Sequence, residues 1–486
     1  MKQITIDPIT RLEGHGKIDI FLDDDGEVRD ACFQVPELRG FERFCQGRPV
    51  EELPRIVSKI CGVCPQAHHL ASGKAVDGVF GIDPKPVVKK LRELYYMAHY
   101  VHSHIAHFYA LAAPDFVLGP GADPALRNVL GVVATVGLEL GGEVLKHRHY
   151  GQHTQTLIGG SGPDPVWTLP GGVSKPLKKE DHAQVLAMGR SSVDFALLSL
   201  DIFRKVVLGN KGYVDLILSD LYGLVVHDMG LVDADDKVNF YDGQVRVTGP
   251  KGQEVDRYWP KDYMHHVGER VEAWSYLKFP YLRKVGWKGF VEGEGSGVYR
   301  ATPLSRLNAA AGMATPRAQA AYEEMYKTLG GKPVHATLAT HWARLVELLY
   351  AAERWVELAE DAEICDPDVR PALKPVAGEG VGCVEAPRGT LTHHYRTDSK
   401  GLVTDVNIIV GTTNNNAPIS MSIAKAAKGV IRKGTELNEG ILNMIEMAFR
   451  AYDPCFSCAT HFLPGQAPLI VRLLDAEGEV VDQIKR

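Results

Sequence analysis

Two Cys-x-x-Cys pairs stand near opposite ends of this 486-residue chain. Cys61 and Cys64 form the first pair, and Cys455 and Cys458 form the second. A Cys-x-x-Cys turn brings two thiolates within reach of one metal, so two such turns supply four ligands if the fold brings them together. The spacing therefore favours a chain whose two ends meet at one buried site.

The spacing alone leaves the identity of the metal open. Zinc is the commonest metal in all-cysteine sites, and a rubredoxin-like iron is a second candidate. Structural zinc sites usually close a short local loop, whereas nearly the whole chain separates these two pairs. A site of this kind at the centre of a large helical protein favours chemistry over a structural role, and thiolates also stabilise nickel and low-spin iron.

Charge and composition argue against several classes of protein. The net charge of -6 gives no reason to expect nucleic acid or an anionic membrane as a partner. No apolar run is long enough to cross a bilayer and the N-terminus does not resemble a signal peptide, so we expect a cytoplasmic protein. Four further cysteines are isolated and are interpreted as buried apolar residues: Cys32, Cys45, Cys365 and Cys383.

Hydrophobic periodicity predicts an α+β fold, with long central helices and with short strands and hairpins near both termini. Alternating residues predict a hairpin formed by residues 17–22 and 28–33. Apolar residues at helical spacing predict long helices over residues 86–113, 186–208 and 336–358. Short strands are predicted at residues 381–385, 389–395 and 402–410, before two late helices. The metal site is expected to be buried where the two Cys-x-x-Cys motifs meet.

Five segments, in order along the chain, resemble motifs of the large subunit of nickel–iron hydrogenases. They are residues 7–15 (DPITRLEGH), 39–42 (RGFE), 59–64 (KICGVC), 385–390 (EAPRGT) and 453–461 (DPCFSCATH). The resemblance covers essentially the full length, and five ordered motifs make a chance match very improbable. One departure is Lys59, where the family commonly has arginine, and lysine lacks the planar guanidinium fork.

The resemblance implies a nickel–iron centre held by four thiolates. By position, Cys61 and Cys455 would bind nickel terminally, while Cys64 and Cys458 would bridge nickel to an iron that carries carbonyl and cyanide ligands. The implied reaction is the reversible heterolytic cleavage of H2 to protons and electrons. The family's usual base is the terminal thiolate, here Cys455. Arg388 is its rival, but a guanidinium with a pKa above about 12 is a poor base, so we interpret Arg388 as an electrostatic element.

The same motifs imply residues around the metal ligands. Glu13 is expected to be the first proton relay, although a loop glutamate is more often a solvated surface charge. Asp115 and Asp453 are expected to lie near the centre and to pair with Arg388; without the resemblance, Asp453 would be interpreted as an Asx-turn before a proline. Thr412 is expected to donate a hydrogen bond to a cyanide nitrogen.

Two histidine predictions and one cation site complete the set. His68 is expected to donate to a bridging sulfur, with a core histidine on a helix face as the alternative. A magnesium site, or one for another divalent cation, is expected from Glu42, the carbonyl of Ile408 and His461. Four other histidines at helical spacing are interpreted as packing residues rather than metal ligands: His99, His102, His104 and His107.

The sequence also predicts partners. It contains no ferredoxin-type run of cysteines, so electrons from H2 would need an iron–sulfur small subunit, together with further electron-transfer subunits. Residues 274–280 and 298–308 resemble the cytoplasmic, multimeric branch of the family, and most closely its methyl-viologen-reducing members linked to heterodisulfide reductase. NAD-reducing enzymes are the close alternative. A non-catalytic, complex I-like structural metalloprotein is the alternative from another class, although such relatives generally lack the four cysteines.

The C-terminal segment is predicted to be a separate extension. We expect residues 1–461 to form a single intertwined catalytic unit and residues 462–486 to be removed by a maturation protease, after insertion factors have delivered nickel. Two stretches of the extension, residues 469–474 and 480–484, are predicted to be strands. The alternative is a permanent terminal hairpin.

Overall fold

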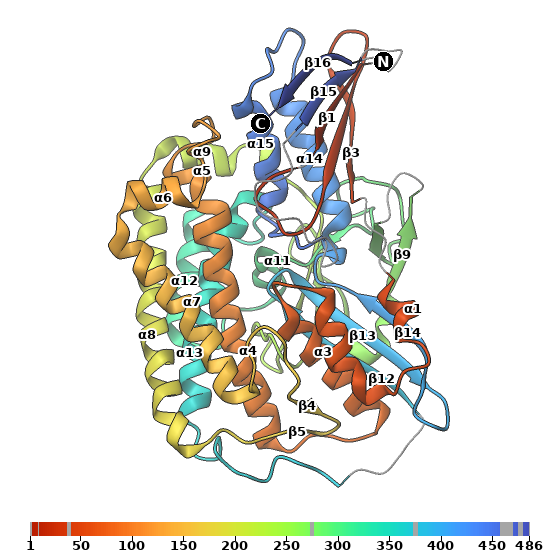
Figure 1. Ribbon diagram of the computed structural model, residues 1–486. Helices are drawn as coiled ribbons and strands as arrows, with labels where there is room; N and C mark the ends of the chain where they lie inside the picture. The colour runs from red at the N-terminus through yellow and green to blue at the C-terminus, as the bar shows by residue number, and fades with distance from the viewer. Residues whose placement is uncertain are drawn as a thin grey trace.

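The structure is a computed structural model that describes residues 2–7, 9–35, 40–272, 277–372, 378–456, 470–474 and 480–485. Long helices stand on one side, and a three-stranded sheet covered by helix α3 (Pro65–Val79) lies on the other (Figure 1). Helices α14 (Asn416–Val430) and α15 (Glu439–Arg450) pack against a five-stranded sheet at the top of this view. This mixture of helices and sheets confirms the predicted α+β class.

The side-by-side helices are the longest elements of the chain (Figure 1). They are α4 (Pro86–Ala106), α7 (Leu138–Gly159), α8 (Lys179–Phe203) and α13 (Thr340–Glu360). Helix α4 starts at a proline, whose missing N–H costs nothing in the first turn, and it buries its apolar face. Among the described residues, no helix combines the length and the apolarity needed to span a bilayer.

Shorter helices connect these elements. They are α1 (Phe41–Cys45), α2 (Leu53–Val57), α5 (Ala113–Val117), α6 (Val129–Val136), α9 (Lys211–Leu218), α10 (Tyr263–His266), α11 (Pro303–Ala309) and α12 (Pro316–Thr328).

The three predicted long helices are present with shifted boundaries, and α13 begins at Thr340 rather than at residue 336. The predicted helix over residues 86–113 is α-helical as far as Ala106, and a π-helical turn (His107–Ala112) then leads into α5. Pro114 offers no N–H to the carbonyl four residues earlier, which explains a wider turn at this point. Helix α8 begins at Lys179, earlier than predicted, and ends in a second π-helical turn (Arg204–Leu208).

The five-stranded sheet joins the two ends of the chain. Its order is β16 (Val480–Lys485), β15 (Ile470–Leu474), β1 (Lys2–Asp7), β2 (Lys17–Leu22) and β3 (Val28–Gln34), and every pairing is antiparallel. The predicted hairpin β2–β3 and the two predicted strands of the extension are therefore confirmed. Ile18 and Ile20 of β2 are fully buried and belong to the same core as Phe449 of α15.

The three-stranded sheet also follows the prediction. It consists of β12 (Glu379–Ala386), β13 (Gly389–Thr397) and β14 (Val403–Ile409). Helix α3 lies directly on β12, where a Cβ at Gly382 would come within 1.9 Å of the carbonyl oxygen of Ala71. Only glycine permits this close approach, which fixes the position of the helix that starts directly after Cys64.

Strands in the middle of the chain were not predicted. Strands β11 (Tyr299–Arg300), β6 (His227–Val232), β7 (Gln244–Thr248) and β8 (Glu254–Tyr258) form one sheet, in that order. Two separate strand pairs are also present: β9 (Val267–Val271) with β10 (Lys278–Leu282), and β4 (Thr168–Leu169) with β5 (Gly172–Val173). The strands predicted near the termini are present, and the middle of the chain, predicted to be helical, also contains these strands. All six residues of β6 are buried, so its sequence lacks the alternation that marks a half-exposed strand.

Candidate metal centre

The fold brings the two cysteine motifs together. Cys61 and Cys64 directly precede α3, and Cys455 follows α15 in a loop that pairs with the segment around Glu13. The sulfur of Cys61 lies 2.7 Å from that of Cys64 and 2.9 Å from that of Cys455. All three sulfurs lie within 4.8 Å of one another. The predicted meeting of the chain ends is confirmed for these cysteines, while Cys458 lies outside the described residues.

The charge balance of the three thiols favours a bound cation. Hydrogen bonds to Cys455 and Cys61, together with burial, raise the pKa of Cys64 well above its usual value. Three crowded sulfurs do not all ionise without a positive charge, and a metal ion supplies that charge. The backbone N–H of Cys64 also donates to the sulfur of Cys61 over 3.0 Å, which favours a thiolate at that position. This buried set of soft donors fits nickel and low-spin iron.

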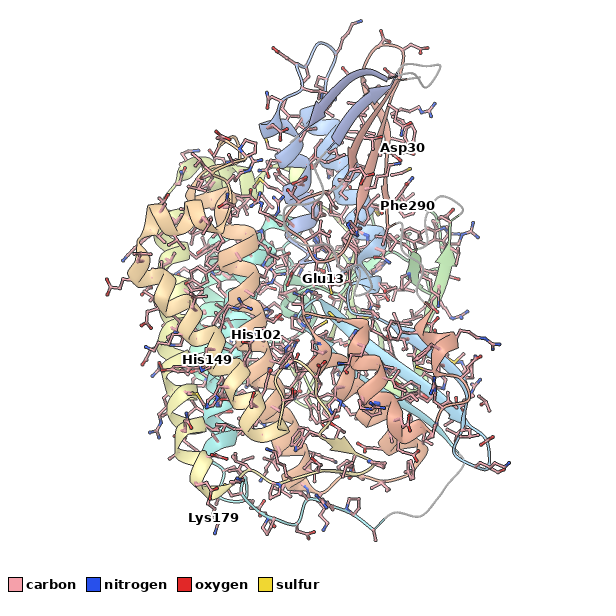
Figure 2. All side chains as sticks on the ribbon, in the orientation of Figure 1. Glu13, Asp30, His102, His149, Lys179 and Phe290 are labelled. Carbon is pink, nitrogen blue, oxygen red and sulfur yellow. The ribbon has the colours of Figure 1, made fainter. Side chains whose placement is uncertain are left out.

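Glu13 lies against one of the sulfurs, near the middle of the molecule (Figure 2). The thiol of Cys455 donates to Oε2 of Glu13 over 2.9 Å. The backbone carbonyl of Glu13 also accepts a hydrogen bond from the N–H of Phe456, at 2.9 Å. Side chain and main chain therefore both fix Glu13 beside Cys455, where a carboxylate can exchange a proton with the sulfur.

Arg388 is a buried cation beside the three sulfurs. Burial alone would lower its pKa, but the charges of Asp453 and of the cysteines outweigh burial and raise the pKa, so Arg388 stays protonated. Its Nη2 donates to Oδ1 of Asp453 over 3.2 Å, as predicted, and its Nη1 donates to Oγ of Ser103 over 3.4 Å. Gly389 makes the tight turn after it, because a Cβ there would lie 2.3 Å from a backbone oxygen of Gly411.

The predicted pairing of Asp115 with Arg388 is wrong. The carboxylate of Asp115 binds Arg11 at 2.5 Å and Arg450 at 2.8 Å instead. The π-helical turn after α4 sets α5 beside α15, which places Asp115 opposite Arg450. Asp115 therefore ties the loop that carries Glu13 to the helix that leads to Cys455.

The sequence analysis did not identify Ser103 as a partner of Arg388, because a serine within a helical pattern carries no chemical signal of its own.

Thr412 lies beside Cys455, and two of the predicted magnesium ligands lie beside each other. The hydroxyl of Thr412 accepts from the backbone N–H of Cys455 over 3.2 Å. Oε1 of Glu42 accepts from the backbone N–H of Ile408 over 3.2 Å, and the ammonium of Lys278 lies 3.7 Å from the same oxygen. Two of the three predicted cation ligands are therefore adjacent, whereas His461 lies outside the described residues.

The histidines of α4 and the π-helical turn do not form a metal cluster. His104 contacts the carboxylate of Glu347 at 3.0 Å, and His107 contacts the backbone carbonyl of Arg450 at 2.9 Å. Within the part of the chain that the structure describes, the grouped metal donors are the three cysteines. The predicted packing role agrees with these contacts.

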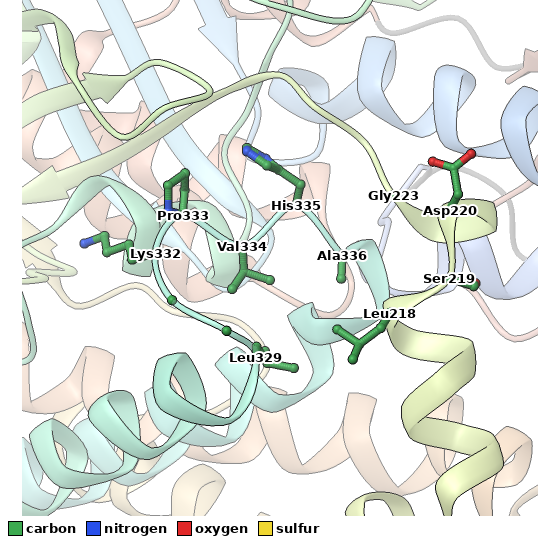
Figure 3. A pocket seen from close by; sticks show the side chains of 12 residues that line it. Leu218, Ser219, Asp220, Gly223, Leu329, Lys332, Pro333, Val334, His335 and Ala336 are labelled. Atoms are coloured by element: carbon green, nitrogen blue, oxygen red, sulfur yellow. The ribbon is translucent and has the colours of Figure 1, made fainter.

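A pocket of about 440 Å³ lies between residues 218–223 and the loop of residues 329–336 (Figure 3). Leu218, Leu329 and His335 are among the residues that line it. None of the sequence-predicted site residues contributes to this pocket, so it is separate from the cysteine centre.

Three clustered cysteine sulfurs, a carboxylate and a buried arginine form a candidate metal centre, and comparison with known proteins identifies the family. A model described as "Nickel-dependent hydrogenase" matches residues 39–122 and 226–461, and one described as "HoxL-like" matches residues 3–38. The chain belongs to the nickel-dependent hydrogenase family, as a large subunit that catalyses reversible H2 cleavage.

Relatives match along the whole chain. An iron-sulfur subunit of the F420-non-reducing hydrogenase of Archaeoglobus profundus is 50% identical over 100% of both chains. A subunit of the F420-non-reducing hydrogenase of Methanothermobacter thermautotrophicus is 41% identical, and the beta subunit of the NAD-reducing hydrogenase HoxS of Cupriavidus necator is 38% identical, again over 100% of both chains. A crystal structure of an NAD+-reducing [NiFe]-hydrogenase aligns with a TM-score of 0.88 and 38% identity, over 95% of this chain and 100% of that chain.

Proposed function

We propose that Cys61 and Cys455 bind nickel terminally and that Cys64 and Cys458 bridge nickel to an iron carrying carbonyl and cyanide ligands. When bound, this centre supplies the site at which H2 is polarised and cleaved heterolytically. The observation that carries the proposal is the convergence of the Cys61, Cys64 and Cys455 sulfurs from opposite ends of the chain, with Glu13 on one of them.

Metal analysis and infrared spectroscopy of the purified protein test this proposal together. We expect equal nickel and iron, together with the stretching bands of carbonyl and cyanide ligands. Zinc alone, without such bands, would contradict the proposal and favour the alternative of a structural metalloprotein.

Side chains around the centre carry out proton transfer and electrostatic stabilisation. The sulfur of Cys455 accepts the proton released from H2, and Glu13, 2.9 Å away, takes it toward solvent. Arg388 holds a fixed positive charge beside the sulfurs, where it favours charge separation without giving up its own proton. The hydroxyl oxygen of Thr412 accepts a hydrogen bond from the backbone N–H of Cys455. In this proposal the same hydroxyl also donates its hydrogen to a cyanide nitrogen.

Replacement of Arg388 by lysine is expected to lower H2 oxidation by about tenfold or more, with both metals retained. An ammonium keeps the charge but not the planar fork that reaches Asp453 and Ser103 at the same time. Steady-state H2 oxidation and metal content measure the two effects. The matched control is Arg396→Lys on the exposed part of β13, which should change neither. Wild-type turnover in Arg388→Lys would show that the planar guanidinium group is not needed for catalysis.

We also propose a magnesium site, or one for another divalent cation, formed by Glu42, the carbonyl of Ile408 and His461. The contact between Glu42 and the backbone of Ile408 supports it, since a carboxylate and a carbonyl are the donors that Mg2+ prefers. Titration of metal-depleted protein with Mg2+ tests the site. Loss of this binding in Glu42→Gln is the expected result.

An iron–sulfur small subunit is the proposed electron acceptor, with further subunits carrying electrons onward. The supporting observation is that, among the described residues, cysteine sulfurs gather only at this centre, so this part of the chain shows no cysteine set for an iron–sulfur cluster along which electrons could leave. The matching relatives come from both candidate branches, the F420-non-reducing hydrogenases of the methyl-viologen-reducing type and the NAD-reducing type. The cytoplasmic location and the maturation factors stay predictions.

We propose that the mature enzyme ends at His461 and that residues 462–486 are removed after nickel insertion. The match to the nickel-dependent hydrogenase model ends at residue 461, which supports this boundary. Before cleavage, β15 pairs with β1, with Gln3 opposite Leu474, so the extension is anchored on the terminal sheet. Intact-mass measurement on active protein decides the matter. A full-length mass with full activity would favour the permanent hairpin instead.

A further inference from the structure

The turn that carries Arg388 does not match the twist of its own strands. Arg388 stands at the tip of a two-residue hairpin between β12 and β13, where Ala386 pairs with Gly389. Such loops favour turns with a positive φ at the first loop residue, because those turns follow the right-handed twist of the strands. Here that residue is Pro387, whose ring fixes φ at about −65°, and Arg388 has a negative φ as well. We therefore expect contacts from outside the hairpin to hold the turn.

Buried side chains provide these contacts, because they donate hydrogen bonds to four consecutive carbonyl oxygens, those of residues 385–388. Tyr100 on α4 donates its hydroxyl hydrogen to the first oxygen over 2.7 Å, and the side-chain amide of Asn415 donates to the last over 2.8 Å. The guanidinium of Arg306 on α11 donates to both inner oxygens, over 3.0 Å and 3.3 Å. All three donor residues are buried. The two middle peptides of the turn therefore depend on one side chain.

The guanidinium of Arg306 uses all of its donors. Its Nε and Nη2 donate to the two carboxylate oxygens of Glu347 over 2.6 Å and 2.7 Å, and its Nη1 donates to the carboxylate of Glu385 over 3.2 Å. Together with the two carbonyls, these contacts match the five N–H groups of an arginine. Burial alone would lower the pKa of Arg306, but the charge of Glu347 outweighs burial and raises the pKa, so Arg306 stays protonated.

Glu347 anchors this guanidinium to the long helices. It lies on α13, and its Oε2 is 3.0 Å from Nε2 of His104 on α4. Burial lowers the pKa of His104 to about 4, so a neutral imidazole donates this hydrogen bond near pH 7. A carboxylate bound to both arms of a guanidinium fork resists rotation. Helix α11, near the middle of the molecule, thus joins the hairpin to α13 (Figure 1).

We propose that Arg306 and Glu347 are positioning residues for H2 cleavage, which fix the turn of residues 385–388 and thereby hold the guanidinium of Arg388 beside the sulfurs. The inference rests on the role proposed for Arg388 and adds the groups that keep it in place. A charge stabilises charge separation best when its position is set before the reaction. A displacement of about 1 Å can slow a reaction by up to about 10²-fold.

Arg306→Lys tests the inference. Lysine keeps the positive charge beside Glu347, but donors on a single nitrogen cannot bind both carbonyls and the carboxylate fork. We expect both metals to be retained and H2 oxidation to be about tenfold slower. The matched control is Arg354→Lys, because Arg354 on α13 binds Glu93 on α4 over 2.8 Å and 3.1 Å but does not contact the turn. This control should turn over at the rate of the unmodified enzyme.

The double variant Arg306→Lys/Arg388→Lys separates positioning from a general loss of structure. If Arg306 acts through Arg388, the double variant should be no slower than Arg388→Lys alone. Two independent losses of about tenfold would instead multiply to about 100-fold, which would overturn the inference. Unmodified turnover in Arg306→Lys would overturn it as well. Unmodified turnover in Arg388→Lys would overturn the role proposed for Arg388, and this inference with it.

Glu347→Gln provides the measurement if Arg306→Lys fails to retain the metals. Glutamine has the same shape but only one acceptor oxygen, and Arg306 keeps the carboxylate of Glu385 as its counter-charge. We expect H2 oxidation to be about threefold slower, with no further loss when Arg388→Lys is added. A loss that multiplies with that of Arg388→Lys, or no loss at all, would show that Glu347 and Arg306 do not position Arg388.

Discussion

Serine in place of Cys61, Cys64, Cys455 or Cys458, one at a time, is expected to abolish both H2 oxidation and nickel retention. Serine has nearly the same size, but its hydroxyl is a hard, weakly acidic donor that does not replace a soft thiolate. The three described sulfurs lie within 4.8 Å of one another, so loss of one opens the whole ligand set. Metal content and H2-dependent reduction of methyl viologen measure the two losses.

A buried cysteine outside the centre provides the control. Cys383 on β12 is 1% exposed, and its sulfur accepts a hydrogen bond from the hydroxyl of Thr392 over 3.7 Å. A serine there keeps a polar partner, so Cys383→Ser should retain nickel and activity. Normal nickel content and turnover in all four ligand variants would contradict the assignment of these cysteines as metal ligands.

Local patterns predicted the elements whose two faces differ. The sequence of β2 begins with alternating polar and apolar residues, and the long helices repeat apolar residues at helical spacing, so both are visible in sequence. Strand β6 is buried at every position and therefore shows no alternation, which is why the middle sheet was missed. The glycines that let α3 lie on β12 have meaning only once the two elements are placed together.

The clustering of Cys61, Cys64 and Cys455 was predictable because cysteine spacing and motif order mark these residues, whereas their surroundings depend on tertiary packing. Asp453 was correctly paired with Arg388, since it stands two residues before Cys455 in the same motif. Asp115 was assigned by resemblance to the family, and the π-helical turn before it directs its carboxylate to Arg11 and Arg450. No local pattern encodes a partner that lies on another helix.

Replacement of Glu13 by glutamine is expected to lower H2 oxidation by about 10² to 10⁴-fold while leaving the metals and the infrared bands intact. The amide has the same shape, and its oxygen can still accept from the thiol of Cys455, now at 2.9 Å from the carboxylate. The backbone contact between Glu13 and Phe456 does not involve the side chain, so the loop should keep its place. What the amide lacks is the ability to take up a proton and pass it on.

Isotope experiments separate this loss from a loss of chemistry. Cleavage and re-formation of H2 within the site need no proton exchange with solvent, so conversion between ortho- and para-H2 should persist in Glu13→Gln. Exchange between D2 and water requires the proton to leave, so it should fall together with turnover. Glu13→Asp keeps an ionisable group at a shorter reach and should recover part of the rate. Wild-type turnover in Glu13→Gln would assign the first proton transfer from Cys455 to another group.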